Sequence, residues 1–66
     1  MNTLVYVGGE IKGYELNIGE KLTFIKQREF NEMGITVKLN VLWSEKEQQV
    51  VYVTANELTE CFRLVA

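Results

Sequence analysis

Residues 34–43, Gly-Ile-Thr-Val-Lys-Leu-Asn-Val-Leu-Trp, form the most regularly patterned segment of this sequence. Apolar residues occupy every second position from Ile35 onward, and polar residues fill most positions between them. Alternate side chains of a β-strand point to opposite faces, whereas a helix would scatter these residues around its circumference. We therefore predict a central strand of an antiparallel sheet with one buried face. The residues predicted to face the core are Ile35, Val37, Leu39, Val41 and Trp43.

The length and cysteine content limit how the fold can be stabilised. Sixty-six residues predict a single domain, residues 1–66. A core of this size contributes about 3–5 kcal/mol of net stability. Cys61 is the only cysteine and there is no histidine, which excludes an intramolecular disulfide and a zinc site of the Cys/His type. Stability must come from apolar burial, with oligomerisation as a further source.

The charge balance is slightly acidic, with seven Lys and Arg against nine Glu and a net charge of -2. Nucleic-acid-binding proteins usually carry a basic excess that neutralises phosphates, and this chain lacks one overall. A single thiol is typical of the reducing cytoplasm, and the N-terminus does not resemble a signal peptide. The apolar run over residues 50–53, which no other run exceeds, is far shorter than the roughly 20 residues of a membrane helix. We expect a soluble cytoplasmic protein.

The first half of the chain predicts two strands. Residues 3–7 are rich in β-forming residues and end at a pair of glycines. Residues 21–28 form the second predicted strand, with Leu22 and Phe24 facing inward. Ile25 interrupts its alternation, which predicts one β-bulge or a strand with two apolar faces. Residues 29–34 are predicted to form a structured loop, too long for a tight hairpin and with room for one helical turn.

The second half of the chain predicts a hairpin, a helical turn and a last strand. Residues 44–47 are a polar connection, and residues 48–54 form the returning strand. Thr54 and Glu57 have the spacing of a capping box, which predicts a single 3₁₀ or α-helical turn near residues 55–60. Residues 62–65 form the last strand. Five short antiparallel strands with one helical turn predict an all-β fold, a small barrel or sandwich.

Two segments resemble the SH3-like small β-barrel. Residues 16–24, Leu-Asn-Ile-Gly-Glu-Lys-Leu-Thr-Phe, are similar to the diverging turn of that fold, where a Gly-acidic pair precedes an apolar strand. Residues 51–58, Val-Tyr-Val-Thr-Ala-Asn-Glu-Leu, are similar to its fourth strand entering the 3₁₀ turn. With the strand count, the resemblance spans most of residues 3–65 and implies a five-stranded antiparallel barrel. This fold hosts many unrelated functions.

The resemblance does not extend to the SH3 domains that bind proline-rich peptides. The tyrosine pair of their groove falls near Val5 and Val7, and their groove tryptophan falls near Ile35. The proline and tyrosine around their 3₁₀ turn are replaced by Thr54 and Glu57. We therefore do not expect polyproline recognition. The chain is more similar to the looser SH3-like barrels of bacterial and phage proteins, which act as interaction modules, assembly factors or nucleic-acid binders.

The sequence offers no pattern that points to an enzyme, a metal site or a cofactor. Cys61 lacks a histidine to activate its thiol, so we expect a core or half-buried cysteine. The glycine spacings match neither phosphate-binding motif. The glutamates lie in loops, strand ends or polar runs, and we expect them to form a solvated surface rather than an acid/base pair. They are Glu10, Glu15, Glu20, Glu29, Glu32, Glu45, Glu47, Glu57 and Glu60.

The leading functional hypothesis is a non-enzymatic module that binds another protein or a second copy of itself, in a phage or mobile-element setting. Large apolar groups near loops and strand ends would either cap the open ends of the barrel or form an exposed contact patch. Strand addition at a free sheet edge is a second route to the same function. The candidate protein-binding residues are Tyr14, Phe30, Met33 and Trp43.

The alternative hypothesis is nucleic-acid binding through a lysine-rich face of the sheet. Basic side chains interleaved with Tyr14 and Phe30 would contact phosphates while the aromatic rings stack on bases. The interspersed glutamates weaken this hypothesis. The candidate residues are Lys12, Lys21, Lys26, Arg28 and Lys38.

Overall fold

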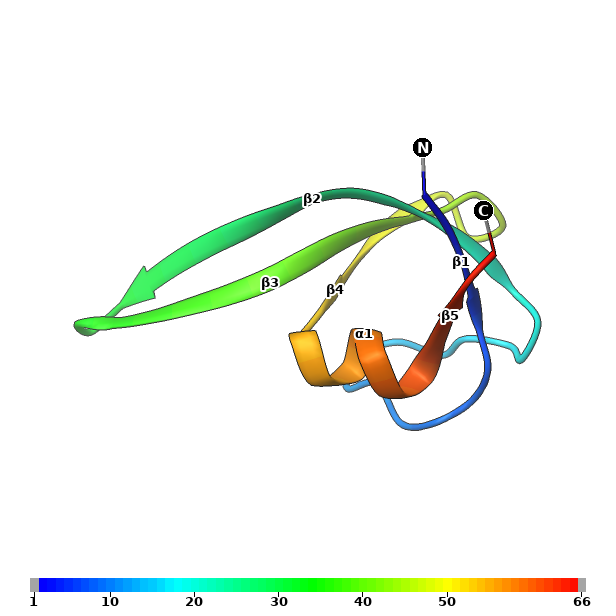
Figure 1. Cartoon of the computed structure of the whole chain (residues 1–66). Coiled ribbons are helices and arrows are strands. Elements are labelled where there is room, and N and C mark those ends of the chain that lie inside the picture. The colour runs from blue at the N-terminus through cyan, green and yellow to red at the C-terminus, as the bar shows by residue number, and fades with distance from the viewer. Residues whose placement is uncertain (1, 66) are drawn as a thin grey trace.

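The computed structural model describes residues 2–65 and confirms the all-β class, with five antiparallel strands in one sheet and one short helix. The strand order is β4-β3-β2-β1-β5. The sheet curls over α1, and the far ends of β2 and β3 project from the body as a long hairpin (Figure 1). The elements are β1 (Thr3–Tyr6), β2 (Lys21–Glu32), β3 (Ile35–Ser44), β4 (Gln49–Val53), α1 (Ala55–Cys61) and β5 (Phe62–Leu64).

The core lies between the sheet and α1. The rings of Tyr6 and Phe62 meet edge to face, with their centroids 5.6 Å apart. Partly buried Phe24 and Leu58 pack against the same cluster from β2 and α1. Each fully buried aliphatic side chain stabilises the fold by about 1.5–3 kcal/mol, so this cluster supplies most of the folding free energy. The buried apolar residues are Leu4, Tyr6, Ile11, Leu22, Leu42, Val51, Val53, Cys61 and Phe62.

A β-bulge at Ile25 sets which side chains of β2 face the core. The pairing with β3 shifts between Phe24 and Lys26, which leaves Ile25 without a partner residue, so the predicted bulge is confirmed. Lys26 lies opposite Val41. Without the extra residue, Lys26 would lie opposite Asn40 on the core face, because a one-residue slip exchanges the two faces of a strand. The bulge therefore keeps this lysine out of the core.

The prediction of a structured loop over residues 29–34 is wrong. β2 continues through Glu32, and a two-residue turn, Met33-Gly34, connects it to β3. Both turn residues have positive φ, 52° and 80°, as a type I′ hairpin turn requires. Glycine adopts this conformation freely, whereas methionine rarely does, which is why the sequence pattern did not indicate a tight turn.

The prediction that the alternating apolar residues of β3 face the core is also wrong, because the whole row lies on the face of the sheet opposite to Leu42. Ile35 and Val37 are 65% and 44% exposed, and Leu39 is half-buried. The alternation correctly indicates that these residues lie on the same face of the sheet as Val41 and Trp43. β3 itself has no extra residue in its pairing with β2, so every second residue of β3 stays on one face. The core face of β3 instead carries the buried Leu42, with Asn40 two residues before it and Ser44 two residues after it. A second, apolar face of the sheet thus points away from the core.

The predicted capping box is confirmed, and it starts a longer helix than expected. The Glu57 N–H donates to Thr54 Oγ1 at 3.1 Å, and the Thr54 N–H donates to Glu57 Oε1 at 2.8 Å. These bonds satisfy two backbone donors that the helix start would otherwise leave free. α1 then runs for seven residues rather than one turn. In the described residues 2–65, no helix has the length and apolarity that crossing a membrane requires.

Candidate interaction surface

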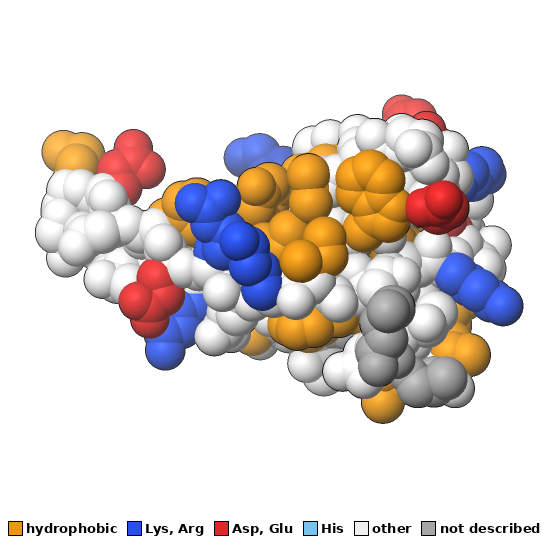
Figure 2. All heavy atoms as spheres, turned by 90° about the horizontal axis from the view of Figure 1, so that it is seen from above, with side chains coloured by type: hydrophobic (Ala, Val, Ile, Leu, Met, Phe, Trp, Pro, Cys, Tyr) orange, Lys and Arg blue, Asp and Glu red, His pale blue; other side chains and the backbone are white. Residues whose placement is uncertain are grey.

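The face of the sheet that points away from the core carries a continuous set of apolar and basic side chains, which we call the outer face. In the ladder, Lys26 lies opposite Val41, Arg28 opposite Leu39, and Phe30 opposite Val37. Figure 2 looks onto this side and shows hydrophobic side chains gathered in the middle, beside Lys and Arg side chains. The outer face consists of Lys26, Arg28, Phe30 and Glu32 on β2, Ile35, Val37, Leu39, Val41 and Trp43 on β3, and Val50 and Tyr52 on β4.

The projecting hairpin is amphipathic as a result. Its opposite face is polar and includes an ion pair between Lys38 Nζ and Glu29 Oε1 at 3.7 Å. Both side chains of this pair are largely exposed, so it contributes little to stability. The polar face carries Gln27, Glu29, Asn31, Thr36 and Lys38.

The outer face is only partly covered by its own side chains. Val41, at its centre, is 3% exposed because neighbouring side chains on β2 and β4 surround it. Val37, farther along β3 toward the hairpin tip, is 44% exposed, and Ile35 beyond it is 65% exposed. Val50, on the neighbouring strand β4, is 37% exposed. Clustered exposed apolar groups of this kind mark interaction sites in monomeric proteins.

Aromatic residues on the outer face are held in place by neighbours. The rings of Phe30 and Tyr52 meet edge to face with centroids 6.0 Å apart, and Arg28 Cζ lies 5.0 Å from the Phe30 centroid. The half-buried Trp43 donates from Nε1 to Glu45 Oε2 at 2.7 Å. Rigid aromatic side chains of this kind lose little conformational entropy when a partner binds.

The structure brings together only two of the four predicted protein-binding residues. Phe30 and Trp43 share the outer face. Met33 lies at the hairpin tip, 96% exposed, and half-buried Tyr14 packs against the core cluster from the loop before β2. Tyr52 joins the aromatic group, and sequence reasoning missed it. Its alternation with Val51 and Val53, both in the core, was the signal that pointed to the outer face.

Tyr14 instead protects an edge of the sheet. β4 is an edge strand, and the backbone N–H of Tyr52 donates to Tyr14 Oη at 3.3 Å. Two residues on, the Thr54 N–H donates to Glu57. These partners occupy two outward backbone donors at the C-terminal end of β4, and the other edge strand, β5, is three residues long. Both features reduce the length of free edge that an added strand could pair with.

The predicted basic residues do not form one surface. Lys26 and Arg28 share the outer face, and Lys21 lies at the distant end of β2, opposite Val5. Lys38 lies on the polar face of the hairpin. The fifth candidate, Lys12, lies in the loop between β1 and β2.

One glutamate departs from the expected solvated surface. Glu20 is 8% exposed, and it accepts from the fully buried Ser44 Oγ at 2.7 Å and from the Asn17 N–H at 3.2 Å. Ser44 Oγ in turn accepts from the Glu47 N–H at 3.2 Å. This network joins the loop before β2 to the β3–β4 turn. Its member Ser44 directly follows Trp43 in the sequence. It is a structural network, because its polar atoms are satisfied within the fold.

Cys61 is buried, as expected, and this predicts a testable pH dependence. Burial, and then the negative charges of Glu57 and Glu60, raise the pKa of the thiol above its ordinary value of 9.0. The folded state therefore favours the protonated thiol over the thiolate. The stability that the buried, protonated thiol contributes is fully present below pH 9 and is lost as the pH rises through the folded-state pKa.

We expect the unfolding free energy to fall above pH 9, and to fall less in Cys61→Ala, as measured by urea denaturation. The thiol should also resist a disulfide reagent at neutral pH until the protein unfolds. Rapid labelling of the native protein, or the same pH dependence in the variant, would contradict this prediction.

The comparisons with known proteins do not assign the chain to a protein family. No protein-family model matches the sequence, and neither a curated protein nor a solved structure matches the chain. Within residues 2–65, no three His, Cys, Asp or Glu side chains gather in a metal-binding arrangement.

Proposed function

We propose that this protein is a small interaction module that binds through the outer face of its sheet, and that the partner is a second copy of the same chain. The observation that carries the proposal is the register set by the bulge at Ile25, which places Phe30 beside the apolar row of β3 on the side away from the core. The SH3-like character and a role as a phage or mobile-element accessory protein stay predictions. A helix between the fourth and fifth of five antiparallel strands supports the former.

The charges on the outer face support self-association. Arg28 and Glu32 lie two residues before and after Phe30 on the same face of β2. In a two-fold symmetric pair with antiparallel hairpins packed face to face across Phe30, each Arg28 would meet Glu32 of the second copy. The same packing places Leu39 against Ile35 of the second copy. Isologous interfaces are self-complementary in this way, and they are the commonest form of homo-oligomer.

Charge reversal tests this proposal. We expect sedimentation equilibrium of the wild type to show a concentration-dependent dimer at low salt. Arg28→Glu or Glu32→Arg alone should weaken it about tenfold or more, and the double variant should restore it, because like charges at an interface are strongly unfavourable. The matched control reverses the ion pair on the polar face, Glu29→Lys with Lys38→Glu, and should leave association unchanged.

Two results would contradict self-association through the outer face. One is a monomer at all concentrations, which would leave a different protein as the partner of this face. The other is equal association of both single reversals and the wild type, which would place the interface elsewhere. The proposal places this interaction in the cytoplasm, where a single buried thiol is typical.

Nucleic-acid binding is the second candidate, and one observation favours it. Lys26 and Arg28 lie beside half-buried aromatic and exposed apolar groups on a sheet, which is a common arrangement for single-stranded nucleic acid. However, Arg28 already lies over the Phe30 ring, and the Tyr52 ring packs against the same ring in a T-shaped pair. A mobility shift with single-stranded DNA or RNA that weakens with salt would favour this candidate, and the absence of binding at low salt would remove it.

A further inference from the structure

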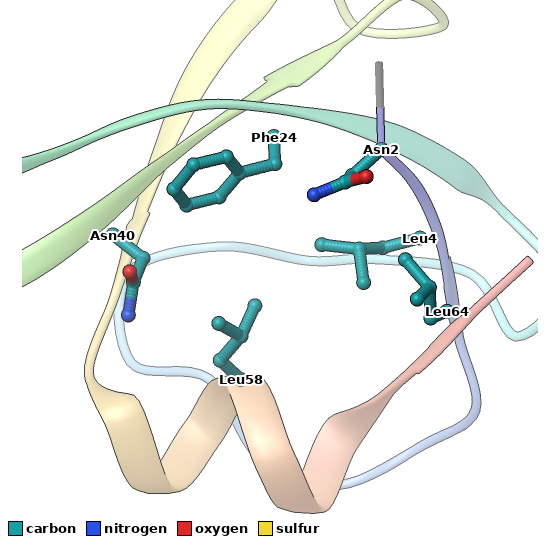
Figure 3. Close-up of a pocket in the computed structure, with 6 residues that line it drawn as sticks. All are labelled: Asn2, Leu4, Phe24, Asn40, Leu58 and Leu64. Carbon is teal, nitrogen blue, oxygen red and sulfur yellow. The ribbon is translucent and has the colours of Figure 1, made fainter. Parts of the chain in front are cut away.

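A second candidate site lies on the other side of the sheet, where a groove separates α1 from β1 and β2. Its volume is about 380 Å³, within the range of ligand-binding clefts. Figure 3 shows Leu58 pointing from α1 toward Leu4 and Phe24, with Leu64 at one end and Asn40 at the other. The lining is mainly apolar, with only two polar side chains. The lining residues are Asn2, Leu4, Phe24, Asn40, Leu58 and Leu64.

Asn40 is the unusual member of this lining. It lies on the core face of β3, two residues before the fully buried Leu42, and it is only 6% exposed. Within residues 2–65 no side-chain hydrogen bond joins its amide to another residue, and the amide is directed into the groove (Figure 3). No fully buried polar side-chain atom in this part of the chain lacks a partner, so the amide atoms still reach solvent at the groove. An apolar residue would suit this position better for folding alone, because an amide with no protein partner in a mainly apolar lining loses part of its hydration.

We propose that this groove binds an extended peptide segment, with a branched aliphatic side chain between Leu4, Phe24 and Leu58 and a backbone amide paired with Asn40. A side-chain amide offers an NH₂ donor group beside a carbonyl acceptor, so one of its N–H groups and its oxygen together can pair with the C=O and N–H of a peptide backbone. The leucine side chains suit an aliphatic group, and β5, which pairs only with β1 in the described chain, leaves the Leu64 end of the groove open. This site is separate from the outer face and does not depend on the proposed self-association.

The probe is N-acetyl-L-leucine methylamide, titrated into labelled full-length protein and followed by NMR. We expect saturable shifts of the Asn40 side-chain amide and of the Leu4, Leu58 and Leu64 methyl groups. N-acetylglycine methylamide, which has no side chain, should bind at least tenfold more weakly. Absence of a saturable response up to the solubility limit of the probe would overturn the proposal.

Variants at position 40 separate binding from folding. Asn40→Leu should keep or raise the midpoint of thermal unfolding while weakening probe binding at least tenfold. Asn40→Asp, which keeps the shape and removes the donor, should weaken binding similarly. Asn31→Leu, on the exposed polar face of the hairpin, is the matched control and should bind normally.

Three results contradict the proposal. A lower unfolding midpoint for Asn40→Leu would show that the amide supports the fold. Undiminished binding in both Asn40 variants would show that the amide does not recognise the probe. Methyl contacts from the chain's own Met1 to Leu4 and Leu58 would show that the groove is filled from within.

Discussion

Gly9→Ala should destabilise the protein by at least about 2 kcal/mol, because it combines backbone strain with a steric clash. Gly9 has a φ of +111°, a conformation that residues with a side chain rarely adopt. A Cβ at this position would lie 2.6 Å from Cys61 Sγ, which is too close for any real contact. Cys61 is buried in the core cluster, so the sulfur has little room to move. Urea denaturation at neutral pH measures the loss.

A matched control separates the strain from the clash. Gly13 also has a positive φ, +92°, but a Cβ there meets no atom within 4 Å. Gly13→Ala should therefore show the strain alone, about 1 kcal/mol. Equal losses for the two variants would mean that Gly9 does not pack against Cys61 as described.

Ser44→Ala should destabilise the fold by about 2 kcal/mol, because it removes the buried hydroxyl that donates to the Glu20 carboxylate. The carboxylate would keep its bond from the Asn17 N–H, and Glu47 would lose its acceptor. Thermal unfolding should show the loss, and Thr36→Ala, at an exposed position of the hairpin, should change stability by less than about 0.5 kcal/mol.

A double-mutant cycle identifies the partner of Ser44. With Glu20→Gln as the background, removing the hydroxyl should cost less, because a neutral amide depends less on the lost hydrogen bond than a buried charge. Additive losses would instead show that Ser44 and Glu20 act independently, and the network linking the loop to the β3–β4 turn would not hold.

The sequence pattern predicted local features of the fold well. Alternation indicates the strand from Ile35 to Trp43, and the Thr54–Glu57 spacing indicates the capping box. Both depend on neighbouring residues, so a local pattern is sufficient to predict them. The interruption at Ile25 leaves a bulge or a strand with two apolar faces open, and the pairing of β2 with β3 decides for the bulge.

The direction of the apolar row could not be predicted from the same pattern. Alternation shows which residues of β3 share a face, but other segments decide which face meets the core. Here Leu42 is the only large apolar residue of β3 on the core face, and β1, β4 and α1 supply most of the core. The pattern alone therefore predicts an interior position for the row that begins at Ile35, although this row lies on the outer face.

The candidate site was only partly predictable for a related reason. Phe30 and Trp43 were identified by size and position near predicted loops, yet they share a face because the bulge changes the phase of β2. The sequence predicts a surface position for Glu20 because its partner, Ser44, is 24 residues away. The groove around Asn40 required the packing of α1 against the sheet, which no single segment indicates.

The central claim is that the apolar row of β3 is uncovered in the single chain and covered by a second copy. Methyl relaxation by a soluble gadolinium chelate, measured over a range of protein concentrations, tests it most directly. We predict that Ile35 and Val37 are strongly relaxed in dilute protein and become protected as the concentration rises, while Leu42 and Val51 stay protected throughout. Protection of Ile35 and Val37 in dilute protein would show that these residues are buried within the single chain. Strong relaxation of both residues at every concentration would show that no second copy covers them.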